Sequence, residues 1–202
     1  MAVDVPNEIL DVIREYGNLL KENNLSEFYW HLNDELRYNS LTGKFTQLLL
    51  DSGMSIYDIF DYLIEELPPG IFYRCTLPDV LHVPKGITTI GSYAFSNCEG
   101  IRELYFNANS IVLDGSGTFA VSDIEKIILP ELEEGYIPAD CFLCCNELKE
   151  IVLTATAPYL QIGRDAFAEI PDDCKIYVPK ILDGTIDCDF GKDEFLSHVI
   201  WI

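Results

Sequence analysis

Cysteines spaced as Cys-x-x-Cys are the residues of this chain with the clearest chemical potential. Cys141 and Cys144 have that spacing, and such a pair can hold zinc or carry out thiol–disulfide exchange. A structural zinc site needs two more ligands, but the sequence has no second pair, and its three histidines are far apart. Cys141 and Cys145 also occupy positions that small residues take in a repeat described below. We therefore expect these thiols to lie in the core, with metal binding and redox chemistry as the alternatives.

Carboxylates are the second chemically capable group, and they gather in clusters in the second half of the chain. The clusters are Glu131, Glu133 and Glu134; Asp172 and Asp173; and Asp187, Asp189, Asp193 and Glu194. Acid–base catalysis would need carboxylates with different pKa values in one cleft. The irregular spacing of the last cluster does not match the ligand register of a calcium-binding EF-hand loop. We predict that these clusters are solvated and that, together with Trp30, they contact a partner.

Motifs with known catalytic mechanics are missing from the sequence. Gly115-Ser116-Gly117 is not followed by a lysine at the spacing of a phosphate-binding loop, and no Gly-x-Ser-x-Gly element occurs. The sequence therefore predicts a protein that is not an enzyme and that uses neither a metal nor another cofactor.

The elements that carry these residues are of two kinds, and the first kind is helical. Apolar residues recur at helical spacing, and we predict four short helices packed as a bundle over residues 1–70. The third helix should cover about residues 42–50. Ser55 and Asp58 resemble a capping box at the start of the fourth. The tandem prolines at 68–69 then end the helical part.

Beyond about residue 75 the chain becomes a repeat. Phenylalanines recur at Phe95, Phe119, Phe142 and Phe167, with spacings of 24, 23 and 25 residues, and a short strand-like segment follows each of them. Such a period with one strand per repeat is typical of leucine-rich solenoids, in which stacked copies bury one another's apolar faces. We predict about four repeats over residues 71–180 and an apolar C-terminal cap over residues 181–202.

The best-formed repeat resembles a specific family. Residues 83–98 contain a proline after an apolar strand, an Ile90-Gly91 turn and the pair Ala94-Phe95, and this segment is similar to the BspA-type leucine-rich repeat. The resemblance covers about residues 80–180, with departures such as Pro138 in place of the turn glycine. It implies a short leucine-rich-repeat-type β-solenoid and a binding or adhesion module without shared catalytic residues. With the helical bundle in front, the fold class is α+β.

Charged residues stand in pairs at the start of the strand-like segments. Arg102-Glu103, Glu125-Lys126 and Lys149-Glu150 occupy matching positions in three repeats, so they should line up across the sheet as a ladder of mixed charge. Such a ladder either supports the sheet through salt bridges or forms a site for a partner. The residues alone leave both interpretations open.

Acidic residues dominate the 202-residue chain, with 34 acidic against 13 basic side chains and a formal net charge of -21. Nucleic acid and anionic membranes are therefore not expected as direct partners, because proteins that bind them carry basic patches. A protein with a basic surface would be attracted, including one whose basic surface normally holds nucleic acid. The alternative is that the charge only keeps the protein soluble.

Signals for export or membrane insertion do not appear in the sequence. The N-terminus lacks the pattern of a signal peptide, and no apolar run reaches the roughly 20 residues that cross a bilayer. The seven cysteines are scattered without a disulfide framework. We therefore expect a cytoplasmic protein with reduced thiols.

These features lead to one functional hypothesis and two alternatives. The first is an acidic, non-enzymatic protein-interaction module that occludes a basic surface. In size and charge such a protein resembles phage-encoded inhibitors of bacterial defence complexes, some of which occupy nucleic-acid-binding grooves. The alternatives are a BspA-like surface adhesin and a scaffold that associates with itself. The sequence leaves the oligomeric state open.

Overall fold

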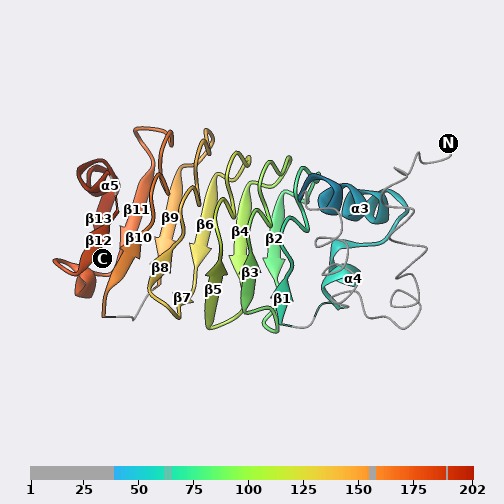
Figure 1. The fold of residues 1–202 in the computed structure, drawn as a ribbon, viewed down its shortest axis with the longest axis horizontal. Helices are drawn as coiled ribbons and strands as arrows, with labels where there is room; N and C mark the ends of the chain where they lie inside the picture. Colours follow the sequence, from blue (N-terminus) through green and yellow to red (C-terminus); the bar gives the residue numbers. More distant parts are fainter. Residues whose placement is uncertain (1–38, 62, 64, 155–157, 190) are drawn as a thin grey trace.

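The computed structural model of the protein describes residues 39–61, 63, 65–154, 158–189 and 191–202. These residues form an elongated β-solenoid, in which each turn of the chain places a strand beside its counterpart in the next turn (Figure 1). Helices α3 (Asn39–Asp51) and α4 (Ile56–Asp61) lie at its N-terminal end. Among the described residues, no helix has the length and apolar character needed to span a membrane.

One side of the solenoid is a six-stranded sheet in which all neighbouring strands are parallel. Its strands, in spatial order, are β2 (Val80–Val83), β4 (Glu103–Phe106), β6 (Lys126–Leu129), β9 (Glu150–Leu153), β11 (Lys175–Val178) and β13 (Val199–Trp201). Inward and outward side chains alternate, so that Ile127 of β6 is buried while Lys126 and Ile128 are half-buried. One strand per turn gives about six turns, and the predicted count of about four repeats is therefore wrong.

The second side of the solenoid consists of two shorter parallel sheets. The first contains β1 (Glu66–Leu67), β3 (Thr89–Gly91), β5 (Ser110–Asp114) and β7 (Glu131–Leu132), and the second contains β8 (Tyr136–Ile137), β10 (Leu160–Ile162) and β12 (Ile186–Cys188). The break falls within one turn of the solenoid, because the chain bends sharply between β7 and β8. Gly135 makes this bend with a φ of 55°, and its N–H donates to the Leu132 carbonyl at 2.8 Å.

Phenylalanine rings form a continuous stack in the interior. The buried rings follow one another with centroid distances from 5.1 to 5.9 Å, and they belong to Phe72, Phe95, Phe119, Phe142 and Phe167. Phe60 of α4 extends the stack at one end and Phe195 extends it at the other. The turn around Phe72 was not predicted from the sequence, because its strand β1 has only two residues and begins soon after α4.

Each of these five turns contains two residues with a left-handed backbone, placed two positions before and two positions after the phenylalanine. The first set is Gly70, Tyr93, Gly117, Asp140 and Asp165, and the second is Arg74, Asn97, Val121, Cys144 and Glu169. This conformation bends the chain around the ring, but it is unfavourable for residues other than glycine. Val121, with a φ of 60°, is the one β-branched residue in the two sets and therefore carries the largest steric penalty.

The first turn of the solenoid is covered by α3. A Cβ atom on Gly43 would lie 1.9 Å from the carbonyl oxygen of Tyr73, so the helix and the turn touch backbone to backbone here. The backbone N–H of Thr76 donates to Gln47 Oε1 at 2.9 Å, and the Cys75 thiol donates to the Gly43 carbonyl at 3.3 Å. The helix thus supplies acceptors to a backbone N–H and to a thiol at the end of the solenoid.

The predicted capping box of the fourth helix is confirmed. The Ser55 N–H donates to the Asp58 carboxylate at 2.9 Å, and the Asp58 N–H donates to the Ser55 hydroxyl at 3.0 Å. The helical part is nevertheless shorter than predicted, because residues 66–67 form β1 and pair with β3. The first two predicted helices lie outside the described residues, so the four-helix bundle stays a prediction.

The C-terminal residues cover the last turn. A 3₁₀ helix (Lys180–Leu182) leads into β12, and helix α5 (Lys192–His198) leads into β13. Phe195 of α5 is buried against Phe167, with ring centroids 5.1 Å apart, and β13 pairs with β11. Apolar side chains remain exposed around this end, most of all Ile181 and Ile202.

The close approach of α3 to the solenoid can be tested with an alanine. We expect Gly43→Ala to lower the free energy of unfolding by about 2 kcal/mol, because the clash with Tyr73 outweighs the better helix propensity of alanine. Gly86→Ala is the matched control, since a Cβ there would meet nothing within 4 Å. Urea denaturation of both variants measures the difference in their free energies of unfolding. An equal loss of stability in the two variants would contradict the close contact between Gly43 and Tyr73.

Relief of backbone strain at Val121 should stabilise the protein. The side chain is 45% exposed, so Val121→Gly loses little apolar burial while removing a left-handed β-branched residue. We expect a gain of about 1 kcal/mol. The same change at Val112, in the extended backbone of β5, should lower stability. Thermal unfolding followed by circular dichroism tests both, and a loss at Val121 as large as that at Val112 would show that no strain is present.

Candidate functional site

One of the predicted acidic clusters and half of another lie on the side formed by the short sheets. Glu131 is in β7, and Glu133 and Glu134 follow it at the break between the sheets, where the Ser110 hydroxyl donates to Glu133 at 2.7 Å. Asp187 is in β12 and Asp189 directly follows that strand; both side chains are exposed. Parallel pairing of β8 with β10 and of β10 with β12 connects the two groups across this side of the molecule.

The remaining predicted residues are elsewhere. Asp172 and Asp173 are exposed in the turn that precedes β11, and Asp193 and Glu194 are exposed in the first turn of α5. The structure therefore does not bring the nine carboxylates together into one site. Trp30 lies outside the described residues.

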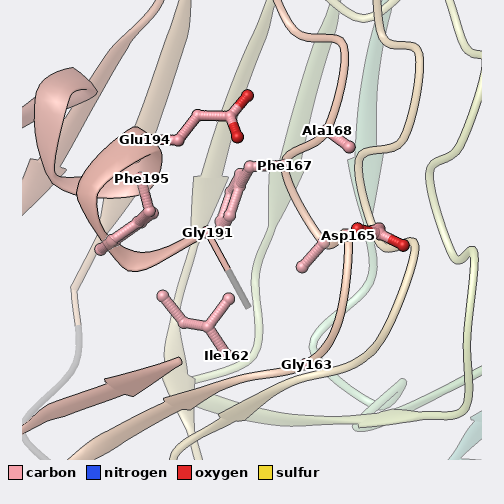
Figure 2. Close-up of a pocket in the computed structure, with 9 residues that line it drawn as sticks. Ile162, Gly163, Asp165, Phe167, Ala168, Gly191, Glu194 and Phe195 are labelled. Carbon is pink, nitrogen blue, oxygen red and sulfur yellow. The ribbon is translucent and has the colours of Figure 1, made fainter. Parts of the chain in front are cut away.

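A small gap separates α5 from the last phenylalanine turn. Figure 2 shows Phe195 on the helix and Phe167 on the turn, with Glu194 and Asp165 at its edge. The gap has a volume of only about 50 Å³. A space of this size admits a few water molecules and no organic ligand. We interpret it as a packing gap between the cap and the solenoid.

A larger, charged groove lies across the beginnings of the strands of the six-stranded sheet. Its volume is about 470 Å³, and it is lined by Asp79, Arg102, Glu103, Glu125, Lys126, Lys149 and Glu150. The six residues of the ladder predicted from the sequence are all among them. The sequence prediction that these charges meet across the sheet is confirmed.

Ion pairs cross from each turn to the next within this groove. Lys126 pairs with Glu150 at 2.6 Å, and Lys149 pairs with Glu125 at 2.5 Å. Arg102 pairs in the same way with Asp79. These hydrogen bonds raise the pKa of Lys126 and of Arg102 above their ordinary values, so both side chains stay cationic. Exposed pairs of this kind contribute little stability individually, but they set the pattern of charge on the surface.

Aromatic and apolar residues form a neighbouring row that the sequence analysis did not identify. His82 and Tyr105 stack with ring centroids 4.9 Å apart, and the register continues through Ile128, Val152 and Tyr177. The Tyr105 hydroxyl donates to Glu103, and this bond raises the pKa of the phenol. In the sequence, each residue of this row from Tyr105 onward stands two positions after the charged residue at the start of its strand, as Ile128 follows Lys126. The residue types at this position differ from repeat to repeat, so one sequence alone does not reveal the row.

The groove presents its charges as ion pairs. Each of its three cations is matched to a carboxylate. Among the described residues, no group of three or more His, Cys, Asp and Glu side chains is placed to hold a metal ion. A groove of this kind offers alternating charge to another surface.

The cysteines of the Cys-x-x-Cys element are separated by the fold. Cys141 and Cys145 are fully buried, and burial raises the pKa of both thiols, whereas Cys144 is half-buried and close to Glu169. The Cys145 thiol donates to the Phe119 carbonyl at 3.1 Å, and Cys98 bonds in the same way to Phe72 at 3.0 Å. The predicted core role of Cys141 and Cys145 is confirmed.

Thiol labelling tests this assignment. Cys144 and Cys188 are the least buried cysteines, so we expect an aromatic disulfide reagent to label these two first in the native protein. The buried thiols should react only on unfolding, because access and thiolate formation both require it. Cys144→Ser and Cys188→Ser should each remove one of the fast-reacting groups. A double variant that combines Cys144→Ser and Cys188→Ser should label only on unfolding. Rapid labelling of Cys141 in this variant while it is folded would contradict the core role.

Comparison with known proteins identifies the solenoid. A family model for the BspA type leucine rich repeat region matches residues 65–184 in six copies. No curated protein and no solved structure shows a significant match to the chain. The family match begins before the segment whose resemblance is visible by eye, since it includes the turn around Phe72. Repeat modules of this class generally mediate protein–protein interaction and are generally non-enzymatic. The matched residues make up more than half of the chain and coincide with the solenoid, so the chain belongs to the BspA-type leucine-rich repeat family.

Proposed function

We propose that this protein is an interaction module that docks through its acidic surface onto a basic surface of another protein. One observation carries the proposal. On the face of the six-stranded sheet, Arg102, Lys126 and Lys149 are paired with carboxylates. With Glu103 and Lys175 this face carries four acidic and four basic side chains, so it contributes no net charge. The excess of 34 acidic over 13 basic side chains therefore falls on the rest of the chain.

The side formed by the short sheets is the proposed contact. Its outward residues include Glu131 and Glu133 near β7 and Asp187 and Asp189 near β12. Two partly exposed tyrosines lie between these groups: Tyr136 in β8 and Tyr159, whose ring lies beside Gly135. Carboxylates around aromatic rings favour arginine and lysine side chains, through ion pairs and cation–π contacts.

The proposed mechanism is occlusion. A rigid, strongly acidic solenoid associates rapidly with a basic surface and covers it, and salt weakens the association. A basic surface that holds nucleic acid fits this description, and a phage-encoded inhibitor of a bacterial defence complex is the setting we favour for it. In that setting the protein acts in the cytoplasm and does not contact nucleic acid itself.

Capture followed by measured binding tests the proposal. The protein is immobilised and exposed to bacterial lysate at low and moderate salt, and a captured partner is then purified. We expect a basic partner whose dissociation constant rises at least about tenfold between the two salt concentrations. A captured partner without a basic surface, or one whose affinity is independent of salt, would contradict the docking mode.

Neutralising variants identify the face. We expect replacement of Glu131, Glu133 and Glu134 by glutamine, together with Asp187 and Asp189 by asparagine, to weaken binding to that purified partner at least about tenfold. The control neutralises Asp172 and Asp173, which are also exposed but precede a strand of the other sheet. An equal effect of both variants on affinity would argue against a localised contact and for non-specific attraction.

A further inference from the structure

The outward face of the six-stranded sheet carries charges that alternate along the solenoid. In register, Glu103, Lys126, Glu150 and Lys175 stand side by side on β4, β6, β9 and β11. The residues one position earlier, Arg102, Glu125 and Lys149, alternate with the opposite phase. Each charge therefore has a neighbour of opposite sign across to the next strand, and each except Lys175, which follows Cys174, also has one along its own strand.

This alternation makes the face complementary to a copy of itself. A two-fold axis that runs parallel to the strands and midway between β6 and β9 places β6 opposite β9 of a second copy, and β4 opposite β11. An axis that lies between two strands brings together strands that are one, three or five places apart in the sheet. Because the charge changes sign from each strand to the next, the charges that meet are unlike. Lys126 faces Glu150 of the second copy, and Glu103 faces Lys175.

The apolar row beside the charges is brought together by the same axis. The row consists of His82, Tyr105, Ile128, Val152, Tyr177 and Ile200. The axis places Ile128 opposite Val152 at the centre and Tyr105 opposite Tyr177 next to them. All six side chains are half-buried or exposed in the single chain. A second copy would thus bury an aromatic and aliphatic strip beside a ladder of ion pairs.

The alternating charge of this face favours a second copy of the chain over other partners. The net charge of -21 opposes self-association in general, but the alternating face is balanced and adds nothing to that repulsion. A uniformly basic or acidic partner would meet a repulsive charge at every second strand. We propose that two copies of the chain associate through their six-stranded sheets, face to face, with the strands aligned.

The dimer is independent of the proposed acidic docking surface. Its contact uses the long sheet, whereas Glu131 and Asp187 lie on the side of the short sheets. Each dimer would then present two acidic surfaces. Binding to a basic partner and association of two copies are measured separately, so either proposal stands without the other.

Sedimentation analysis of the full chain tests the dimer. We expect the wild-type protein to have twice its chain mass at micromolar concentration. Ile128→Asp should return it to a monomer, because it places a carboxylate at the centre of the apolar strip opposite Val152. Val112→Asp is the matched control, since Val112 is also half-buried on a strand but belongs to the other side. Circular dichroism verifies that both variants are folded.

Two outcomes of that experiment overturn the proposal. One is a wild-type protein that remains monomeric throughout the micromolar range. The other is a dimer that Val112→Asp dissociates as readily as Ile128→Asp, which would place the contact elsewhere. Should Ile128→Asp fail to fold, Tyr177→Arg near the edge of the strip replaces it, with the same expected loss of dimer.

A charge exchange tests the symmetry itself. The double variant Lys126→Glu with Glu150→Lys keeps an ion pair between these two positions within the chain, and it keeps unlike charges opposite one another in a dimer of the variant with itself. Against a wild-type copy, however, the new carboxylate at position 126 would face Glu150. We expect the variant to pair with itself and to pair with wild type at least about tenfold more weakly. Free mixing of the two proteins in an equimolar exchange experiment would refute the proposed axis.

Discussion

The stack of buried phenylalanine rings is the interaction on which the rest of the structure depends. A single turn of this solenoid has strands of two to five residues, too short to bury an apolar face by themselves. Each ring packs on the ring of the next turn, with centroids 5.1 to 5.9 Å apart. The same turns also pair their strands on both sides of the solenoid. The left-handed residues on either side of each phenylalanine, including the strained Val121, are a cost of bringing the ring inside.

A stack of this kind must end, and the two ends are closed by different means. At the N-terminal end, α3 has a glycine at position 43, so its backbone can contact the backbone of Tyr73. Gln47 of the same helix accepts a hydrogen bond from the backbone N–H of Thr76. At the C-terminal end α5 contributes Phe195 as a further ring in the stack. Both ends place a helix over the ring stack, but at the C-terminal end β13 follows α5 and forms the edge strand of the six-stranded sheet.

The distribution of charge follows from the same repetition. Positions that stand next to each other across the sheet must not carry like charges, and Lys126 with Glu150 and Lys149 with Glu125 satisfy this condition. Three of the chain's 13 basic residues, Arg102, Lys126 and Lys149, are paired in this way, so they do not offset the acidic charge elsewhere on the chain. We therefore propose different partners for the balanced face and for the acidic side.

The sequence by itself determined the repeat, the burial of Cys141 and Cys145, the capping box at Ser55 and the charged ladder, because each of these depends on spacing along the chain. Its period did not reveal the turn around Phe72, where a two-residue strand follows α4, and β13 fell within the predicted C-terminal cap, so the predicted number of turns was too low. Only the tertiary structure decided which acidic clusters share a side. It also decided that His82 and Tyr105 join an apolar row, because that neighbourhood depends on the register between turns more than twenty residues apart in sequence.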